Sequence, residues 1–253
     1  MITSNSQYDI KTPTGDMRTT VYQPIDTSND DENRSVKYPC IIFYSEIFQQ
    51  TAPIARSAAI MASHGFIVLV PEVFHELNPL GTVLGYDDAG KDKGNQDKWT
   101  KPLEHHDSDT QALVEYAKTL KNSSGKIGAM GVCIGGHLAY RAALNPNILA
   151  AACLYATDIH SNTLPCHEGN DSFSRTPDIK AELLMIWGKQ DPHVPDEDRM
   201  RIHHNLIKSK NTFTWHEFNA QHAFMRDEGE RYDAALAIQV YLMSVELFKR
   251  KLN

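Results

Sequence analysis

One short stretch near the middle of the chain decides the fold: Gly131-Val132-Cys133-Ile134-Gly135-Gly136. It follows an apolar run, Lys126–Gly131, that is typical of a buried strand, and it opens a segment with helical spacing, Cys133–Leu144. The glycines on either side of Cys133 leave space for a tight strand-to-helix turn in which larger side chains would collide. The stretch therefore predicts a sharp turn that presents the Cys133 thiol above a sheet.

Around this turn, apolar runs alternate with helical patterns, which is typical of a parallel sheet covered by helices on both faces. We predict a single α/β domain over residues 1–253, with an N-terminal antiparallel hairpin of Tyr8–Lys11 and Met17–Gln23. The other predicted strands are Cys40–Tyr44, Phe66–Val70, Lys126–Gly131, Leu149–Tyr155, Glu182–Trp187 and Phe213–Phe218. The predicted helices are Thr51–Ser63, Glu104–Leu120, Cys133–Leu144, Asp196–Lys208 and Tyr232–Lys249.

Two segments lack a helical or strand pattern. Thr27–Ser35 is polar and charged, so we expect a surface loop. Asn78–Lys101 is rich in glycine and aspartate and only weakly patterned, which predicts a long loop. A loop of that length in a compact domain usually has a function.

The charge composition of the chain limits the classes of partner that it can be expected to bind. The chain has 25 Lys and Arg against 32 Asp and Glu, a formal charge of −7. Nucleic acids and anionic membranes are recognised mainly through Lys and Arg, so we expect neither as a partner. No apolar run approaches the roughly 20 residues of a membrane span, and the N-terminus lacks a secretory pattern. We expect a cytoplasmic protein, and no pattern indicates its oligomeric state.

The four cysteines are too few and too scattered for a disulfide framework, and no C-x-x-C pair is present. Cys40 and Cys153 lie inside apolar strands, and Cys166 lies in a predicted loop. Cys133 alone occupies the turn described above. On that hexapeptide alone, Cys133 is either a reactive thiol or a buried small hydrophobe, which is the usual fate of a free cysteine.

A nucleophile in such a turn needs an acid and then a histidine further along the chain. Asp191 follows the strand Glu182–Trp187, and His222 follows the strand Phe213–Phe218. Parallel sheets carry their sites at the carboxyl ends of strands, so we expect the three residues to meet there. His222 would then move the thiol proton while Asp191 fixes its tautomer. The alternatives are that Asp191 caps a helix and that His222 is one of 12 histidines without a special role.

Three motifs together resemble the dienelactone hydrolase family, carboxymethylenebutenolidase-like members of the α/β-hydrolases. They are the turn with cysteine, Gly188-Lys189-Gln190-Asp191-Pro192-His193-Val194-Pro195, and His222-Ala223-Phe224. The resemblance extends from about Pro39 to the last helix. It implies an α/β-hydrolase fold and hydrolysis of a small ester or lactone through a thiol acyl-enzyme, with no metal and no organic cofactor.

The resemblance also implies roles around the nucleophile. Glu46 matches a family glutamate that contacts the resting nucleophile, and the backbone amides of Ile47 and Ile134 would form the oxyanion hole. A carboxylate beside a thiol disfavours the thiolate, so Glu46 would keep Cys133 protonated until substrate binds. The alternative for Glu46 is a strand-end carboxylate in solvent.

Members of the family hold a substrate carboxylate with two arginines. Arg226 matches the first, but Glu76, preceded by His75, stands at the position of the second. A carboxylate there should repel an anionic lactone, so we expect a different substrate. Tyr155, at a predicted strand end, either lines the pocket or belongs to the core. Asp158 and His160 follow that strand and are further candidates for contact with substrate.

Paired histidines and His-Glu dipeptides invite a metal site. They are His105-His106, His203-His204, and the dipeptides at 75–76, 167–168 and 216–217. None has H-E-x-x-H spacing, and adjacent side chains point in different directions, so we expect no metal.

Two function classes stay open: a cysteine hydrolase of an ester, lactone or thioester, and a non-catalytic binding module on a hydrolase scaffold.

Overall fold

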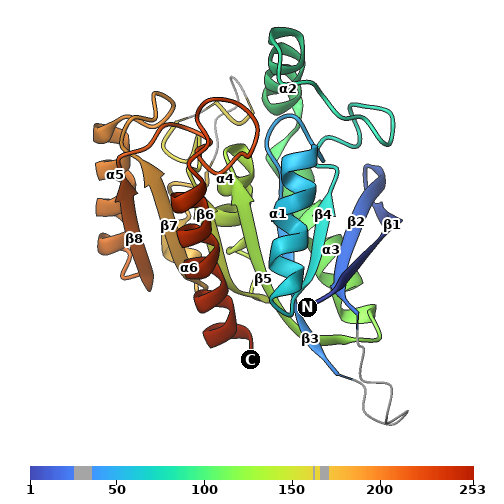
Figure 1. Ribbon diagram of the computed structural model, residues 1–253. Coiled ribbons are helices and arrows are strands. Elements are labelled where there is room, and N and C mark those ends of the chain that lie inside the picture. The colour runs from blue at the N-terminus through green and yellow to red at the C-terminus, as the bar shows by residue number, and fades with distance from the viewer. Residues whose placement is uncertain (26–35, 162, 166–170) are drawn as a thin grey trace.

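The computed structural model describes residues 1–25, 36–161, 163–165 and 171–253. Its centre is a sheet of eight strands in the order β1-β2-β4-β3-β5-β6-β7-β8 (Figure 1). The strands are β1 (Thr3–Thr12), β2 (Gly15–Pro24), β3 (Tyr38–Tyr44), β4 (Ile67–Pro71), β5 (Ser123–Val132), β6 (Ile148–Leu154), β7 (Glu182–Gly188) and β8 (Phe213–Phe218). β1 and β2 form an antiparallel hairpin, β2 also pairs antiparallel with β4, and the remaining neighbours run parallel.

Helices cover both faces of the sheet (Figure 1). They are α1 (Ala52–Ser63), α2 (Asp88–Thr100), α3 (Leu103–Thr119), α4 (Ile134–Ala142), α5 (Asp196–Lys208) and α6 (Ala234–Leu252), with a short 3₁₀ turn at Thr176–Asp178. One core cluster packs α1 and α6 against one face, and a second packs α3, α4 and α5 against the other. Every residue of β3 is buried, as expected for a central strand covered on both sides.

The predicted α/β class, mostly parallel sheet and N-terminal hairpin are confirmed. The helix Asp196–Lys208 and the strand Phe213–Phe218 have their predicted bounds, and both hairpin strands are longer than predicted. The predicted loop Thr27–Ser35 lies outside the described residues, as does Cys166. Within the described ranges, no helix is both long and apolar enough to cross a membrane.

The prediction of a loop over Asn78–Lys101 holds for residues 78–87, which form neither helix nor strand, but is wrong beyond them, because α2 occupies Asp88–Thr100. The Asp87 side chain accepts a hydrogen bond from the Gly90 amide at 2.7 Å and so caps the helix start. The buried residues of α2 are Gly90, Gly94 and Asp97. Because this inward face has no large apolar side chain, α2 lacks the hydrophobic periodicity by which a helix is recognised in a sequence.

The turn around Cys133 has the predicted geometry. β5 ends at Val132, Cys133 adopts φ 58° and ψ −126°, and α4 begins at Ile134. A Cβ on Gly131 would lie 1.9 Å from the Gly135 carbonyl oxygen, and a Cβ on Gly135 would lie 2.2 Å from the Tyr44 carbonyl oxygen. Only glycine fits either position, so the close approach of three backbone segments forces the thiol to the carboxyl edge of the sheet.

Candidate active site

Cys133, Asp191 and His222 come together at the carboxyl edge of the sheet, after β5, β7 and β8. The Asp191 Oδ2 and His222 Nδ1 atoms are 2.7 Å apart, and both residues are buried. Asp191 Oδ1 also accepts a hydrogen bond from the His193 amide at 2.8 Å. The N-cap of α5 is Pro195, so Asp191 does not cap that helix.

The surroundings of His222 favour its protonated form. Burial alone lowers the pKa of His222, but the negative charge of Cys133 and hydrogen bonds with Asp191 and Cys133 outweigh burial and raise it to about 10. Burial opposes ionisation of Asp191 too, but the hydrogen bond with His222 lowers the pKa of that carboxyl. An imidazolium held beside a sulfur stabilises the thiolate, which is the nucleophilic form of cysteine.

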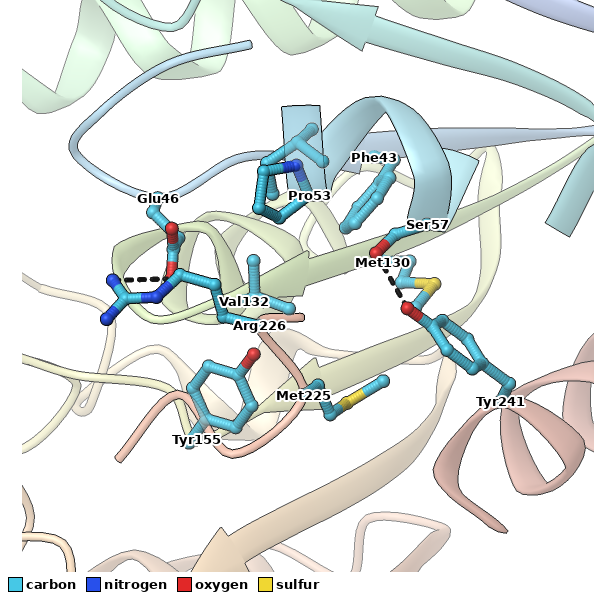
Figure 2. A pocket seen from close by; sticks show the side chains of 11 residues that line it. Phe43, Glu46, Pro53, Ser57, Met130, Val132, Tyr155, Met225, Arg226 and Tyr241 are labelled. Atoms are coloured by element: carbon cyan, nitrogen blue, oxygen red, sulfur yellow. Dashed lines mark hydrogen bonds and ion pairs between the residues drawn. The ribbon is translucent and has the colours of Figure 1, made fainter. Parts of the chain in front are cut away.

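Glu46 lies just beyond β3 and is buried, which excludes the alternative of a carboxylate in solvent. The Tyr86 hydroxyl donates to its Oε2 at 3.0 Å. Arg226 Nη1 lies 4.0 Å from Glu46 Oε1 (Figure 2). Burial raises the pKa of Glu46, and the charge of Arg226 opposes that rise. The Arg226 guanidinium also lies 4.2 Å from the centre of the Tyr86 ring, so Tyr86 holds both charged groups in place.

A cavity of about 370 Å³ opens over Cys133, between α2 and the loops that follow β6, β7 and β8. Its charged lining consists of four cationic side chains and two carboxylates: Lys91, Lys98, Arg226, Arg231, Glu46 and Asp158. Cations therefore outnumber carboxylates in the cavity of a protein whose formal charge is −7. Such a lining attracts an anionic ligand.

The sequence analysis missed the contribution of α2 to this cavity. Lys91, Asn95 and Lys98 line it, and their spacing of four and then three residues places them on one face of the helix. Lys98 Nζ lies 3.2 Å from Asp158 Oδ2 across the cavity. Because α2 lacks an apolar stripe, this polar spacing behind the Asp87 cap was the signal available in the sequence.

His193 is a second residue that the sequence analysis missed. Its ring lines the cavity and packs edge-to-face on the His222 ring, with 4.6 Å between the ring centres. Burial and the charge of His222 lower the pKa of His193. The lowered pKa favours a neutral His193 ring beside His222.

Tyr155 belongs to the core behind the site. It is 1% exposed, and its ring packs edge-to-face on His222 with 5.3 Å between the ring centres. It lines a separate, water-sized cavity of about 10 Å³ beside Glu46 and Arg226 (Figure 2). Tyr155 therefore supports the His222 ring.

His160, another residue that the sequence analysis considered for contact with substrate, pairs with Asp198 at 3.3 Å.

The structure does not place His75 and Glu76 in the lining of the cavity over Cys133. Asp109 oxygens lie 3.2 Å from His75 Nε2 and 2.5 Å from Lys101 Nζ, and Glu76 pairs with His105 at 2.7 Å. Ligand atoms of His75, Glu76 and Asp109 lie within 4.8 Å of one another, as in a metal site. The buried Lys101 ammonium already supplies a positive charge to this cluster, which explains why a carboxylate is tolerated at Glu76.

Because the charge of Cys133 raises the pKa of His222, we predict that Cys133→Ala lowers that pKa from its value of about 10. The folded-state pKa exceeds the ordinary value of 6.5, so protonated His222 stabilises the fold fully below pH 6.5 and loses this effect as the pH rises toward 10. Histidine NMR titration measures the shift directly. An equal His222 titration midpoint in wild type and Cys133→Ala would contradict the influence of the Cys133 charge on His222.

Residues 28–252 match the dienelactone hydrolase family. A predicted carboxymethylenebutenolidase of Saccharomyces cerevisiae is 36% identical over 100% of this chain and 94% of its own length. The carboxymethylenebutenolidase of Pseudomonas putida is 25% identical over 79% of this chain and 80% of its own. The crystal structure of a predicted dienelactone hydrolase from Klebsiella pneumoniae shares the fold, with TM-score 0.84, 18% identity, and 99% and 100% of the two chains covered. The chain therefore belongs to the dienelactone hydrolase family, α/β-hydrolases that act on esters or lactones.

Proposed function

We propose that the protein cleaves a small carboxylic ester or lactone through a covalent intermediate on Cys133. The observation that carries the proposal is the 2.7 Å contact between Asp191 and His222, beside a thiol held at the tip of a strained turn. This arrangement has the nucleophile, base and orienting acid that covalent acyl transfer needs.

The reaction runs in two half-steps. The Cys133 thiolate attacks the ester carbon, and the tetrahedral intermediate collapses as His222 protonates the departing alkoxide. Water then loses a proton to His222 and attacks the thioester, which releases the carboxylic acid. The thiolate and the imidazolium are thereby restored, and Asp191 keeps the His222 ring oriented through both half-steps.

The tetrahedral oxyanion needs hydrogen-bond donors that are already in position. We assign the backbone amides of Ile47 and Ile134 to this role. Ile47 lies beyond β3 and lines the cavity, and Ile134 is the first residue of α4, where free amides and the helix dipole favour negative charge. Glu46, adjacent to Ile47 and lining the same cavity, would adjust the charge state of Cys133.

The cavity lining also suggests the substrate class. Lys98 is compensated by Asp158, Arg226 lies near Glu46, and the exposed Lys91 pairs with Asp88 at 3.5 Å. The positive charge of Arg231 is therefore left in excess within the lining. We therefore propose an ester that carries an acid group. The doubt that Glu76 cast on anionic substrates loses its basis, because Glu76 lies in the Lys101 cluster instead of the cavity.

We expect Cys133→Ala to lower kcat for p-nitrophenyl acetate by about 10⁴-fold or more, because one member of a catalytic triad is lost. Cys40→Ala is the matched control, since it removes a buried thiol of β3 far from the cavity, and it should retain activity. A Cys133→Ala variant as active as wild type would refute the proposed nucleophile. Wild-type inactivity toward esters, lactones and an acyl thioester alike would favour the binding module.

Mono-p-nitrophenyl succinate and p-nitrophenyl valerate have acyl groups of matched length but different charge. We predict that wild type prefers the succinate in kcat/KM by about tenfold, or about 1.4 kcal/mol of transition-state stabilisation, and that salt weakens this preference. Arg231→Gln should reduce the ratio, whereas Lys189→Gln, outside the cavity, should not. A preference for the valerate, or a ratio insensitive to Arg231→Gln, would contradict an anionic substrate.

A further inference from the structure

We infer that Gly94 of α2 is a positioning residue for the oxyanion hole, because it lets the helix rest directly on Ile47. This inference builds on the proposed function. A Cβ on Gly94 would lie 2.7 Å from the Ile47 carbonyl oxygen and 2.9 Å from the Ile47 Cβ. Contacts this short involve backbone and a β-carbon, which cannot rotate away as the end of a flexible side chain can.

The segment that carries Ile47 is held on the same side by residues just before α2. The Leu84 amide donates to the Phe48 carbonyl oxygen at 3.1 Å. The Phe48 and Tyr86 rings pack edge-to-face with 4.7 Å between their centres, and Tyr86 also donates to Glu46. The 84–94 segment therefore determines where the Ile47 amide lies.

Further along, α2 is anchored to the rest of the protein. Lys98 contacts Asp158 at 3.2 Å across the cavity. Lys101, directly after the helix, is fully buried and donates to the Val73 carbonyl oxygen at 2.8 Å and to Asp109 at 2.5 Å. Because these contacts hold α2 in position, an added methyl group at position 94 should displace Ile47 more than it shifts the helix.

Displacement of Ile47 affects the transition state more than the bound substrate. Oxyanion donors act at about 2.7–3.1 Å from the developing charge, and loss of one such donor lowers kcat by about 10²–10³-fold. A shift of a few tenths of an ångström weakens the donor without removing it. The pocket walls that bind the ground state, among them Lys98, Arg226 and Arg231, stay in place.

The test compares two reactions of the same sulfur in Gly94→Ala. Hydrolysis of p-nitrophenyl acetate passes through an oxyanion, whereas alkylation of Cys133 by iodoacetamide displaces iodide from a CH₂ carbon and forms none. We expect kcat to fall about 10–100-fold with KM and the alkylation rate close to wild type. Asp92→Ala, on the exposed face of the same helix, should leave both reactions unchanged.

Wild-type kcat in Gly94→Ala would overturn the inference, and so would an equal loss of hydrolysis and alkylation, which indicates general damage. Iodoacetamide also counts folded active sites, so kcat is expressed per reactive Cys133. If Gly94→Ala does not fold, Leu84→Pro removes the amide that binds Phe48 and should produce the same pattern; unchanged kcat there overturns the inference. Wild-type turnover that survives complete alkylation of Cys133 refutes the proposed function instead.

Discussion

The close backbone contact between the start of α4 and the end of β3 is the constraint on which the site depends. Gly135 approaches the Tyr44 carbonyl so closely that a Cβ would lie 2.2 Å from its oxygen, and Gly131 approaches Gly135 in the same way. In this turn from β5 into α4, Cys133 adopts a φ of 58°. The thiol is thereby aimed at the strand ends, where the loops after β7 and β8 supply Asp191 and His222.

Residues with unfavourable backbone dihedral angles lie near this contact. Within the described ranges, six non-glycine residues have a positive φ. Five of them lie shortly after the ends of β3, β5, β6 and β8, namely Gln49, Cys133, Tyr155, Asp158 and Ala223. Conformations of this kind persist only where the surrounding packing holds them. The buried parallel strands provide that packing, and Tyr155 and His193 then fix the His222 ring from two sides. The orientation of the His222 ring is therefore set by the packing of the fold itself.

The turn and the order of Cys133, Asp191 and His222 could be predicted because they depend on local glycines and on strand ends, which leave clear signals in a sequence. The helix α2 could not be predicted, because its inward face consists of Gly90, Gly94 and Asp97 and has no apolar stripe. Glu76 was expected in the pocket because a family position does not reveal which way a side chain turns. Its partners, Lys101 and His105, are distant in sequence, and such pairings appear only in three dimensions.

The covalent intermediate is the central claim, and the most direct measurement is mass spectrometry of the protein quenched within the first turnover of p-nitrophenyl acetate. The account predicts one acetyl group per chain, located on the peptide that contains Cys133 and removed by hydroxylamine, as a thioester is. Acetyl found only on another residue, or turnover with no covalent adduct at any time, would contradict it.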